Sequence, residues 1–357
     1  MHYYFYKVVI CALSVILSAN IFASDFTVGV LYWSMNIQGQ VVMRKGLERE
    51  ANLINAKAKA NKKKKVKLIT RVGGDGVAGI ENQIKQMDEL IKMKVDIIIV
   101  QPCDNAALSS SLKKANMLGI PVVAYDQYIS SGKLAAYRTS DNYQAGYLDG
   151  EVIASKYNKK ELVKLILVEY PHVSSTVERV NGFLDALKKY SINYKVLKTY
   201  NAIEPVMGKK VGLQILKDFP NKKSVDVVFT VNDGCSLAIV DVLKKASRKE
   251  IAVATIDGDP ASIVNVKNGN ITVVDCAQFC GPLGAEAMKA AYGILNKEKV
   301  PYHALVPVFP VTKKTISKYP GWFGPIPKQF SKPWKSFQPT WEGSLHVIEN
   351  ENKSGQK

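Results

Sequence analysis

The sequence predicts an α/β protein of the doubly wound kind, built as two similar lobes. Short β-rich runs alternate with segments of helical period from residue 26 onward, and a second series of the same kind begins near residue 140. The strand-like runs are nearly continuous in apolar residues, which is typical of parallel sheets covered by helices on both faces. With 357 residues, 47% of them hydrophobic, the chain is long enough for two domains with separate cores.

The first series contains four predicted strands separated by amphipathic helices. The strands span residues 26–33, 66–72, 96–100 and 122–125. After the first strand, Val42, Leu47, Ala51 and Ile54 recur at helical spacing and mark one apolar face.

The second series repeats this pattern with further strands and helices. Its predicted strands lie at residues 162–169, around 196, and at 225–230, 251–256 and 271–274. Its predicted helices lie around residues 177–190, 208–217 and 236–245. The repetition predicts a second sheet of similar size.

The N-terminal segment has the features of an export signal. Lys7 precedes the apolar run Val8–Leu17, and small residues follow at Ala23 and Ser24. We interpret residues 1–23 as a signal peptide, with an uncleaved anchor as the alternative. No later segment approaches the ~20 apolar residues of a membrane span, so the sequence predicts an exported, soluble mature chain.

The chain is strongly basic, with 49 Lys and Arg against 31 Asp and Glu and a net charge of +18. Such a charge raises the question of nucleic-acid binding, but export makes that partner a poor expectation. Much of the charge is local, in the lysine-rich stretch 57–67. This stretch is expected to be a solvated loop or, alternatively, to contact an anionic envelope surface.

The residues just after each strand carry the candidate binding site, because ligands bind at the carboxyl ends of parallel strands. They are mostly acids, amides and aromatics, which suit a polyol: carboxylates accept hydroxyl protons, and amides both donate and accept. We single out Trp33, Asn36, Asp126, Gln127, Asn232, Asp257 and Gln278 as ligand-binding residues. Capping of a helix is the expected role of three further residues, Asp104, Asn142 and Asp233.

Motifs for covalent or metal chemistry are sparse. The four histidines are scattered, and no G-x-S-x-G sequence occurs, so we expect no enzyme activity, no cofactor and no metal. The run Gly73–Gly76 lacks the pattern of a phosphate loop and is expected to be a tight turn. Four cysteines follow residue 24, and both a disulfide near the second-lobe cleft and free buried thiols are consistent with them.

Six sequence blocks occur in the order and spacing of one known family. They are V-D-I-I-I-V-Q-P-C-D-N-A-A-L (95–108), G-I-P-V-V-A-Y-D (119–126), T-S-D-N-Y-Q-A-G (139–146), S-S-T-V-E-R-V-N-G-F (174–183), V-F-T-V-N-D (228–233) and A-T-I-D-G (254–258). Over residues 26–310 the chain thereby resembles the periplasmic sugar-binding proteins of the ribose/galactose type. The resemblance implies two Rossmann-like lobes with parallel sheets, joined by three hinge crossings near Ser140, Gln278 and Leu305.

By the same resemblance, Asp126, Asn232, Asp257 and Gln278 stand at positions where the family binds hydroxyl groups. Other positions depart from the family: Gln127 and Val177 occupy sites where ribose-type members carry Arg, and Ile203 a site that is often aromatic. The first loop lacks the usual stacking pair, although Trp33 precedes it. These departures favour a sugar or cyclitol other than ribose.

The resemblance implies a division of the chain into a signal peptide (1–23), an N-terminal lobe (24–139 and 279–304), a C-terminal lobe (140–278 and 305–311) and a Pro- and aromatic-rich extension (312–357). The expected partners are a sugar or polyol ligand and the membrane permease of an ABC importer. The expected form is a monomer in the periplasm.

The extension supports a rival interpretation, since it is similar to that of periplasmic sensor proteins that present trimethylamine N-oxide or autoinducer-2 to a membrane histidine kinase. Its residues Trp322, Trp334 and Trp341 alternate with prolines, so it is expected to be either a packed strap or a flexible tail.

Overall fold

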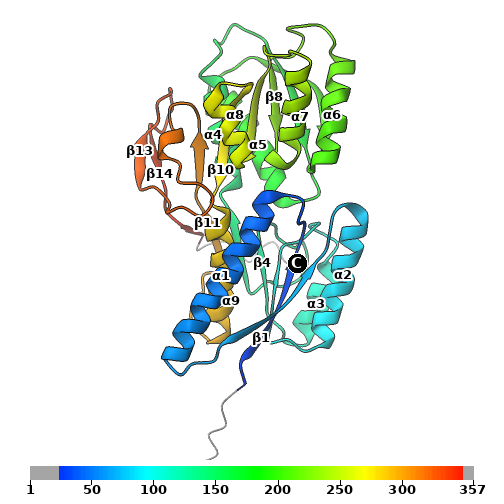
Figure 1. The fold of residues 1–357 in the computed structure, drawn as a ribbon, viewed down its shortest axis with the longest axis vertical. Helices are drawn as coiled ribbons and strands as arrows, with labels where there is room; N and C mark the ends of the chain where they lie inside the picture. The colour runs from blue at the N-terminus through cyan, green and yellow to red at the C-terminus, as the bar shows by residue number, and fades with distance from the viewer. Residues whose placement is uncertain (1–23, 349–357) are drawn as a thin grey trace, which may run out of the picture.

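A computed structural model describes residues 24–348, and the expected signal peptide lies outside these residues. Two lobes follow one another along the long axis of the molecule (Figure 1). The first sheet has the strand order β15-β11-β5-β4-β3-β1-β2, and the second has the order β12-β10-β9-β8-β6-β7. All neighbours in both sheets are parallel except the pairs β11–β15 and β10–β12.

The first lobe contains helices α1 and α9 on one side of its sheet and α2 and α3 on the other (Figure 1). Its strands are β1 (Phe26–Tyr32), β2 (Val66–Val72), β3 (Ile97–Val100), β4 (Val122–Tyr125), β5 (Ala136–Ser140), β11 (His303–Val306) and β15 (His346–Ile348). Its helices are α1 (Gln38–Ala60), α2 (Gly76–Lys92), α3 (Ser109–Met117) and α9 (Cys280–Leu295).

The second lobe repeats this arrangement. Its strands are β6 (Val163–Glu169), β7 (Tyr194–Asn201), β8 (Val227–Thr230), β9 (Ala252–Asp257), β10 (Thr272–Gln278) and β12 (Val308–Val311). Its helices are α4 (Asn142–Ala154), α5 (Ser174–Lys189), α6 (Pro205–Asp218), α7 (Asp233–Lys245) and α8 (Pro260–Asn268). The predicted α/β class with two parallel sheets is therefore confirmed.

The chain passes between the two sheets after β5, after β10 and between β11 and β12. The first two crossings follow Ser140 and Gln278, as the resemblance implies. The third lies at Pro307, because Leu305 and Val306 still pair with β5 in the first sheet. The three crossings confirm the hinged two-lobe fold.

Close packing of α4 against α5 in the second lobe positions Arg179. A Cβ atom added at Gly146 in α4 would lie 1.8 Å from the carbonyl oxygen of Arg179 in α5. The two helices therefore pack backbone against backbone, which only glycine at this position allows. This contact fixes the first turns of α5, where Arg179 is buried.

The C-terminal extension packs against the second lobe and then returns to the first. It contains the hairpin strands β13 (Gln329–Ser331) and β14 (Thr340–Glu342), which lie beside the second lobe (Figure 1). Its last strand, β15, pairs with β11 at the edge of the first sheet, a contact the sequence did not predict. The extension thus contacts both lobes, as expected of a packed strap.

The strap is anchored by aromatic and ionic contacts. The ring of Trp341 stacks on Phe330 with centroids 5.2 Å apart, and both are buried. The Lys332 ammonium lies 2.9 Å from a carboxylate oxygen of Glu151 in α4, with side-chain exposures of 2% and 0%. Breaking such a buried pair costs about 3–5 kcal/mol, so it holds the extension on α4.

Several sequence-based expectations are corrected by the structure. The N-caps of α4 and α7 are Asp141 and Asn232, one residue before the predicted Asn142 and Asp233. Asp104 accepts from two backbone amides in a turn but does not cap α3, which begins after Leu108. The four cysteines in the described part of the chain are unpaired and buried, so the alternative of free thiols holds and the disulfide was wrong. No helix within residues 24–348 is long and apolar enough to span a membrane.

Candidate functional site

A small cavity lies between the lobes, where strands of both sheets end. Six of the seven predicted site residues line it: Trp33, Asp126, Gln127, Asn232, Asp257 and Gln278. The seventh, Asn36, does not; its side chain is exposed and donates to the Asp75 carboxylate. The remaining lining includes residues from the start of α1, from α5 and from the loop at Ile203.

Two buried aspartates face this cavity from opposite lobes. Asp126 follows β4 and is 4% exposed, and Asp257 ends β9 and is 6% exposed. Both have positive φ angles, 66° and 131°, which are uncommon for residues other than glycine and carry strain. Backbone strain at buried polar residues is concentrated at functional sites, so it marks these two carboxylates as functional candidates.

Asp126 is held by amide groups. Its Oδ2 accepts from Nε2 of Gln101 at 2.9 Å and from Nε2 of Gln127 at 3.0 Å. Its Oδ1 has no hydrogen-bond partner within the described residues. Burial raises the pKa of Asp126, and the charge of Arg179 and the two amide bonds oppose this. One acceptor atom is therefore available to a ligand hydroxyl.

Asp257 is held by a cation and an amide. Its Oδ1 accepts from Nη1 of Arg179 at 3.2 Å and from Nε2 of Gln278 at 2.6 Å. Burial raises the pKa of Asp257 to about 6, although Arg179 and Gln278 pull it down. Gln278 in turn accepts from the Ser140 hydroxyl at 2.7 Å, so its amide links the first two crossings.

Arg179 is the functional candidate that the sequence reasoning missed. It is 3% exposed, lines the cavity, and also donates to Asn142 Oδ1 at 3.0 Å and to the Val231 carbonyl at 2.7 Å. Val177, which the sequence comparison placed at the arginine position, is 39% exposed and lies outside the cavity. The helical phase of α5 contained the signal, since Ser175 and Arg179 are four residues apart and share one face.

The other predicted residues have defined places around the cavity. Trp33 is 3% exposed, and its ring stacks with Tyr170 of the second lobe at a centroid distance of 6.4 Å. The Asn232 amide donates to the Ile203 carbonyl at 3.0 Å, and its oxygen accepts from the Cys235 amide at 3.2 Å. Asn232 therefore combines a capping role with a place in the cavity wall.

The lobes are closed on one another in this structure. Gln127 donates across the cleft to the Ser175 hydroxyl at 3.2 Å, and the Ser174 amide donates to Asn105 Oδ1 at 3.0 Å. The cavity has a volume of about 20 Å³. This is room for about one water molecule, so a larger solute requires the cleft to open or the lining side chains to move apart.

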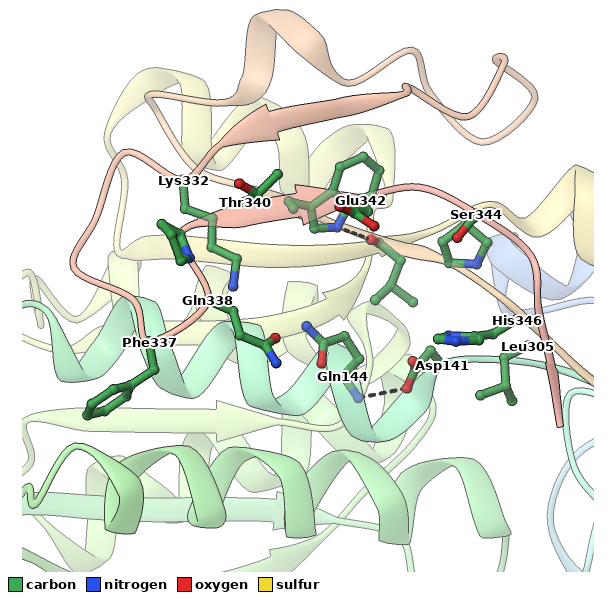
Figure 2. A pocket seen from close by; sticks show the side chains of 14 residues that line it. Asp141, Gln144, Leu305, Lys332, Phe337, Gln338, Thr340, Glu342, Ser344 and His346 are labelled. Atoms are coloured by element: carbon green, nitrogen blue, oxygen red, sulfur yellow. Dashed lines mark hydrogen bonds between the residues drawn. The ribbon is translucent and has the colours of Figure 1, made fainter. Parts of the chain in front are cut away.

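A larger cavity of about 620 Å³ lies on the hinge side, between the extension and the start of α4. Figure 2 shows Lys332 and Gln338 projecting from the extension toward Gln144 at the start of α4, whereas the Phe337 ring points away from Gln144 and Asp141. None of the seven predicted site residues lines it. The predicted residues therefore converge on the cleft and not on the hinge cavity.

Metal and covalent chemistry have no constellation to act through in the part of the chain that the structure covers. Within residues 24–348, no group of three or more His, Cys, Asp or Glu side chains is arranged to hold a metal ion. Burial raises the pKa of the Cys235 and Cys280 thiols well above the ordinary range, which disfavours the reactive thiolate. The site is suited to hydrogen bonding.

Comparison with known proteins agrees with this architecture. A family model described as a periplasmic binding protein domain matches residues 28–299. The ribose import binding protein of Bacillus subtilis is 29% identical over 277 residues, which cover 77% of this chain and 84% of that protein. A solved ABC-transporter periplasmic solute-binding protein from Actinobacillus succinogenes, with bound D-allose, is 26% identical, has a TM-score of 0.69 and covers 83% of this chain and 100% of its own.

A second similar solved structure is the fructose-binding periplasmic domain of a hybrid two-component system. It is 23% identical with a TM-score of 0.71, and the match covers 82% of this chain and 92% of that one. At this identity the likeness concerns the fold alone. The matched relatives are solute-binding proteins and not enzymes. The chain therefore belongs to the periplasmic binding protein family, in its ribose/galactose-like type I branch.

Proposed function

We propose that this protein is a periplasmic receptor that captures a sugar or cyclitol between its two lobes and delivers it to an ABC importer. One observation carries the proposal: a buried carboxylate from each lobe faces the same cavity, Asp126 from the first and Asp257 from the second. A hydroxylated ring can donate to both carboxylates at once, and such charge-assisted bonds are strong in a site that excludes water. Binding would thereby hold the lobes together.

The remaining lining supports a neutral, hydroxyl-rich ligand. The amides of Gln127, Asn232 and Gln278 can donate to or accept from hydroxyl groups. Arg179 supplies a donor, but Asp257 already balances its charge at 3.2 Å. The indole of Trp33 offers an apolar face for the C–H side of a ring. A phosphorylated or anionic solute would instead meet two carboxylates, which repel it.

Delivery to a permease, export by residues 1–23 and action as a monomer belong to the same proposal. Family membership supports delivery to a permease, and the apolar N-terminal sequence supports export. The relatives described as import binding proteins support the importer.

A sensor co-receptor is the second candidate. The extension beyond residue 311 lies outside the family match at 28–299, and a domain of a two-component system shares the fold. In that role the closed form would engage a membrane histidine kinase.

Isothermal titration calorimetry with D-ribose, D-allose and myo-inositol tests the ligand class, with an anionic sugar phosphate as the matched control. The proposal predicts micromolar or tighter binding of at least one neutral polyol and no detectable binding of the sugar phosphate. Mass spectrometry of small molecules released on denaturing the purified protein extends the search. Preferential binding of an amino acid or an anion would refute the sugar assignment.

A further inference from the structure

We propose that Trp322, in the C-terminal extension, is a positioning residue of the ligand site: together with Asp275 it holds the peptide group that follows Asp257 and so aims the Asp257 carboxylate into the cleft. The inference rests on the proposed function in one respect, namely that Asp257 binds the solute. The extension would then be part of the binding site and not only a cover on the lobe surface.

Two hydrogen bonds hold the peptide unit between Asp257 and Gly258. The indole Nε1–H of Trp322 donates to the Asp257 carbonyl at 2.6 Å. The N–H of the next residue, Gly258, donates to Asp275 Oδ1 at 2.9 Å. The carbonyl and the N–H of a peptide group point in opposite directions, so the two bonds together oppose its rotation.

This peptide needs such support because the backbone around it is strained. Asp257 has φ 131° and Gly258 has φ 79°, both in the region that favours glycine. Residues in such conformations persist only where the surroundings over-determine them. A rotation of the 257–258 peptide would change ψ of Asp257 and φ of Gly258, so the strained backbone that carries the Asp257 side chain would readjust. The two bonds therefore maintain the geometry that brings its carboxylate to Gln278 and Arg179.

Other contacts fix Trp322 itself at the second crossing. Its carbonyl accepts from the Gly281 amide in the first turn of α9, at 3.1 Å. The Tyr319 hydroxyl, on the same segment, would lie 2.7 Å from a Cβ atom placed on Gly258. Segment 319–322 is thus packed between the turn at Gly258 and the crossing after β10. The family match ends at residue 299, before this segment begins.

The test uses substitutions that remove one N–H donor and leave an aromatic ring. Trp322→Phe removes the bond to the Asp257 carbonyl. Trp334→Phe is the matched control: it removes a bond from the same extension, 3.2 Å to Glu151, away from the cleft. Calorimetry uses the neutral polyol among ribose, allose and myo-inositol that the wild type binds most tightly. We expect Trp322→Phe to weaken binding about tenfold, since it leaves a carbonyl unpaired, and Trp334→Phe to change it less than twofold.

A double-mutant cycle separates positioning from general stability. If Trp322 acts through Asp257, then Asp257→Asn/Trp322→Phe should bind no more weakly than Asp257→Asn alone. Additive losses would overturn the proposal. Equal affinities of Trp322→Phe and wild type would overturn it as well, whereas an unaffected Asp257→Asn would refute the proposed function of Asp257.

Amide hydrogen exchange supplies a readout that needs no ligand. In the unliganded protein, Trp322→Phe should speed exchange of the Gly258 amide about tenfold relative to Trp334→Phe, because only the bond to Asp275 then holds its peptide group, which opens more readily. Unchanged protection of Gly258 would overturn the positioning role even if no polyol of the panel binds.

Discussion

Asp126 follows β4 in the first lobe and Asp257 ends β9 in the second, and different parts of the chain support their backbones. The Asp126 carbonyl accepts from the hydroxyls of Thr139 at 2.8 Å and Tyr137 at 3.2 Å, both on the adjacent strand β5. The Asp257 carbonyl accepts from Trp322 in the extension. The first lobe thus supports its carboxylate from its own sheet, whereas the second lobe uses a segment that follows the whole two-lobe body.

The electrostatic surroundings of the two carboxylates also differ. Asp126 is bound by neutral amides, while Asp257 forms an ion pair with Arg179 in which both side chains are less than 10% exposed. Removing one member of a buried ion pair leaves the other charge uncompensated. Removing a carboxylate that is bonded only to neutral amides leaves no such charge behind. The comparison therefore predicts that the second-lobe half of the site is the more sensitive to mutation.

The largest expected effect is that of Asp257→Ala. It removes a hydroxyl acceptor and strands the buried Arg179, so we expect polyol binding to weaken and the free energy of unfolding to fall by about 3–5 kcal/mol. Asp126→Ala should weaken binding by about 2–3 kcal/mol and affect stability less. Calorimetry and thermal unfolding of both variants measure this. Equal losses of stability in the two variants would contradict the predicted difference between the lobes.

The next effect concerns the anchor of the extension. Lys332→Met keeps most of the apolar stem but leaves the Glu151 carboxylate, fully buried, without its cation. The Glu151 carboxylate still accepts hydrogen bonds from Tyr190, Trp334 and Ser336. We therefore expect the free energy of unfolding to fall by about 3 kcal/mol, the lower end of the range for broken buried pairs.

At about 2.1 cal/mol/K of unfolding entropy per residue, a protein of this size then loses roughly 1–2 °C in Tm per kcal/mol, which differential scanning calorimetry resolves. Glu151→Gln/Lys332→Met should recover part of the loss, because no buried charge remains unpaired. A Tm within 1 °C of wild type for Lys332→Met, measured at the same pH, would show that the extension is not held as the structure indicates.

Much of this molecule could be predicted from the sequence because the relevant signals are local. The apolar runs of β3 and β4 identified the sheets. The acids, amides and aromatics at strand ends gave seven predicted site residues, of which six line the cleft. Strand β5 was missed because its sequence, AYRTS, is polar yet fully buried. The buried Arg138 within it donates to the carbonyls of Pro301 and Tyr302, an interaction between segments far apart in the chain.

The errors at the site have a similar origin. Arg179 was passed over because the resemblance directed attention to Val177, which lies outside the cavity, whereas Arg179 lies on the face of α5 that lines it. Asn36 was included because it follows the first strand, but its side chain turns outward to Asp75. The contact of Trp322 with Asp257 spans 65 residues, and no local pattern encodes it.

A smaller effect is a pH dependence that arises from Asp275 in the second lobe. Burial raises the pKa of Asp275 to about 8, with the nearby Asp149 carboxyl adding to it and bonds from Ser262, Asp233 and Gly258 opposing it. In the unfolded chain the group titrates near pH ~4, so between these values the folded state binds more protons. The stability that Asp275 contributes is therefore present at low pH and is lost as the pH rises toward 8.

Asp275→Asn tests the direction of this pH dependence, because the Asn side-chain oxygen can still accept from the Gly258 amide but does not titrate. Thermal unfolding from pH 5 to pH ~8.5 should show a smaller decline in Tm for the variant than for wild type. A decline in the variant equal to or steeper than that of wild type would mean that the pKa of Asp275 is not raised in the folded protein.

The claim that one carboxylate from each lobe holds a hydroxylated solute is tested most directly by a crystal structure of the protein with the small molecule that co-purifies with it. We predict a neutral polyol in the cleft, with hydroxyl oxygens within hydrogen-bonding distance of both Asp126 and Asp257, a ring face against Trp33, and the Trp322 indole still bonded to the Asp257 carbonyl. A solute that contacts only one lobe, or that lies in the hinge cavity beside Asp141 and His346, would contradict the account.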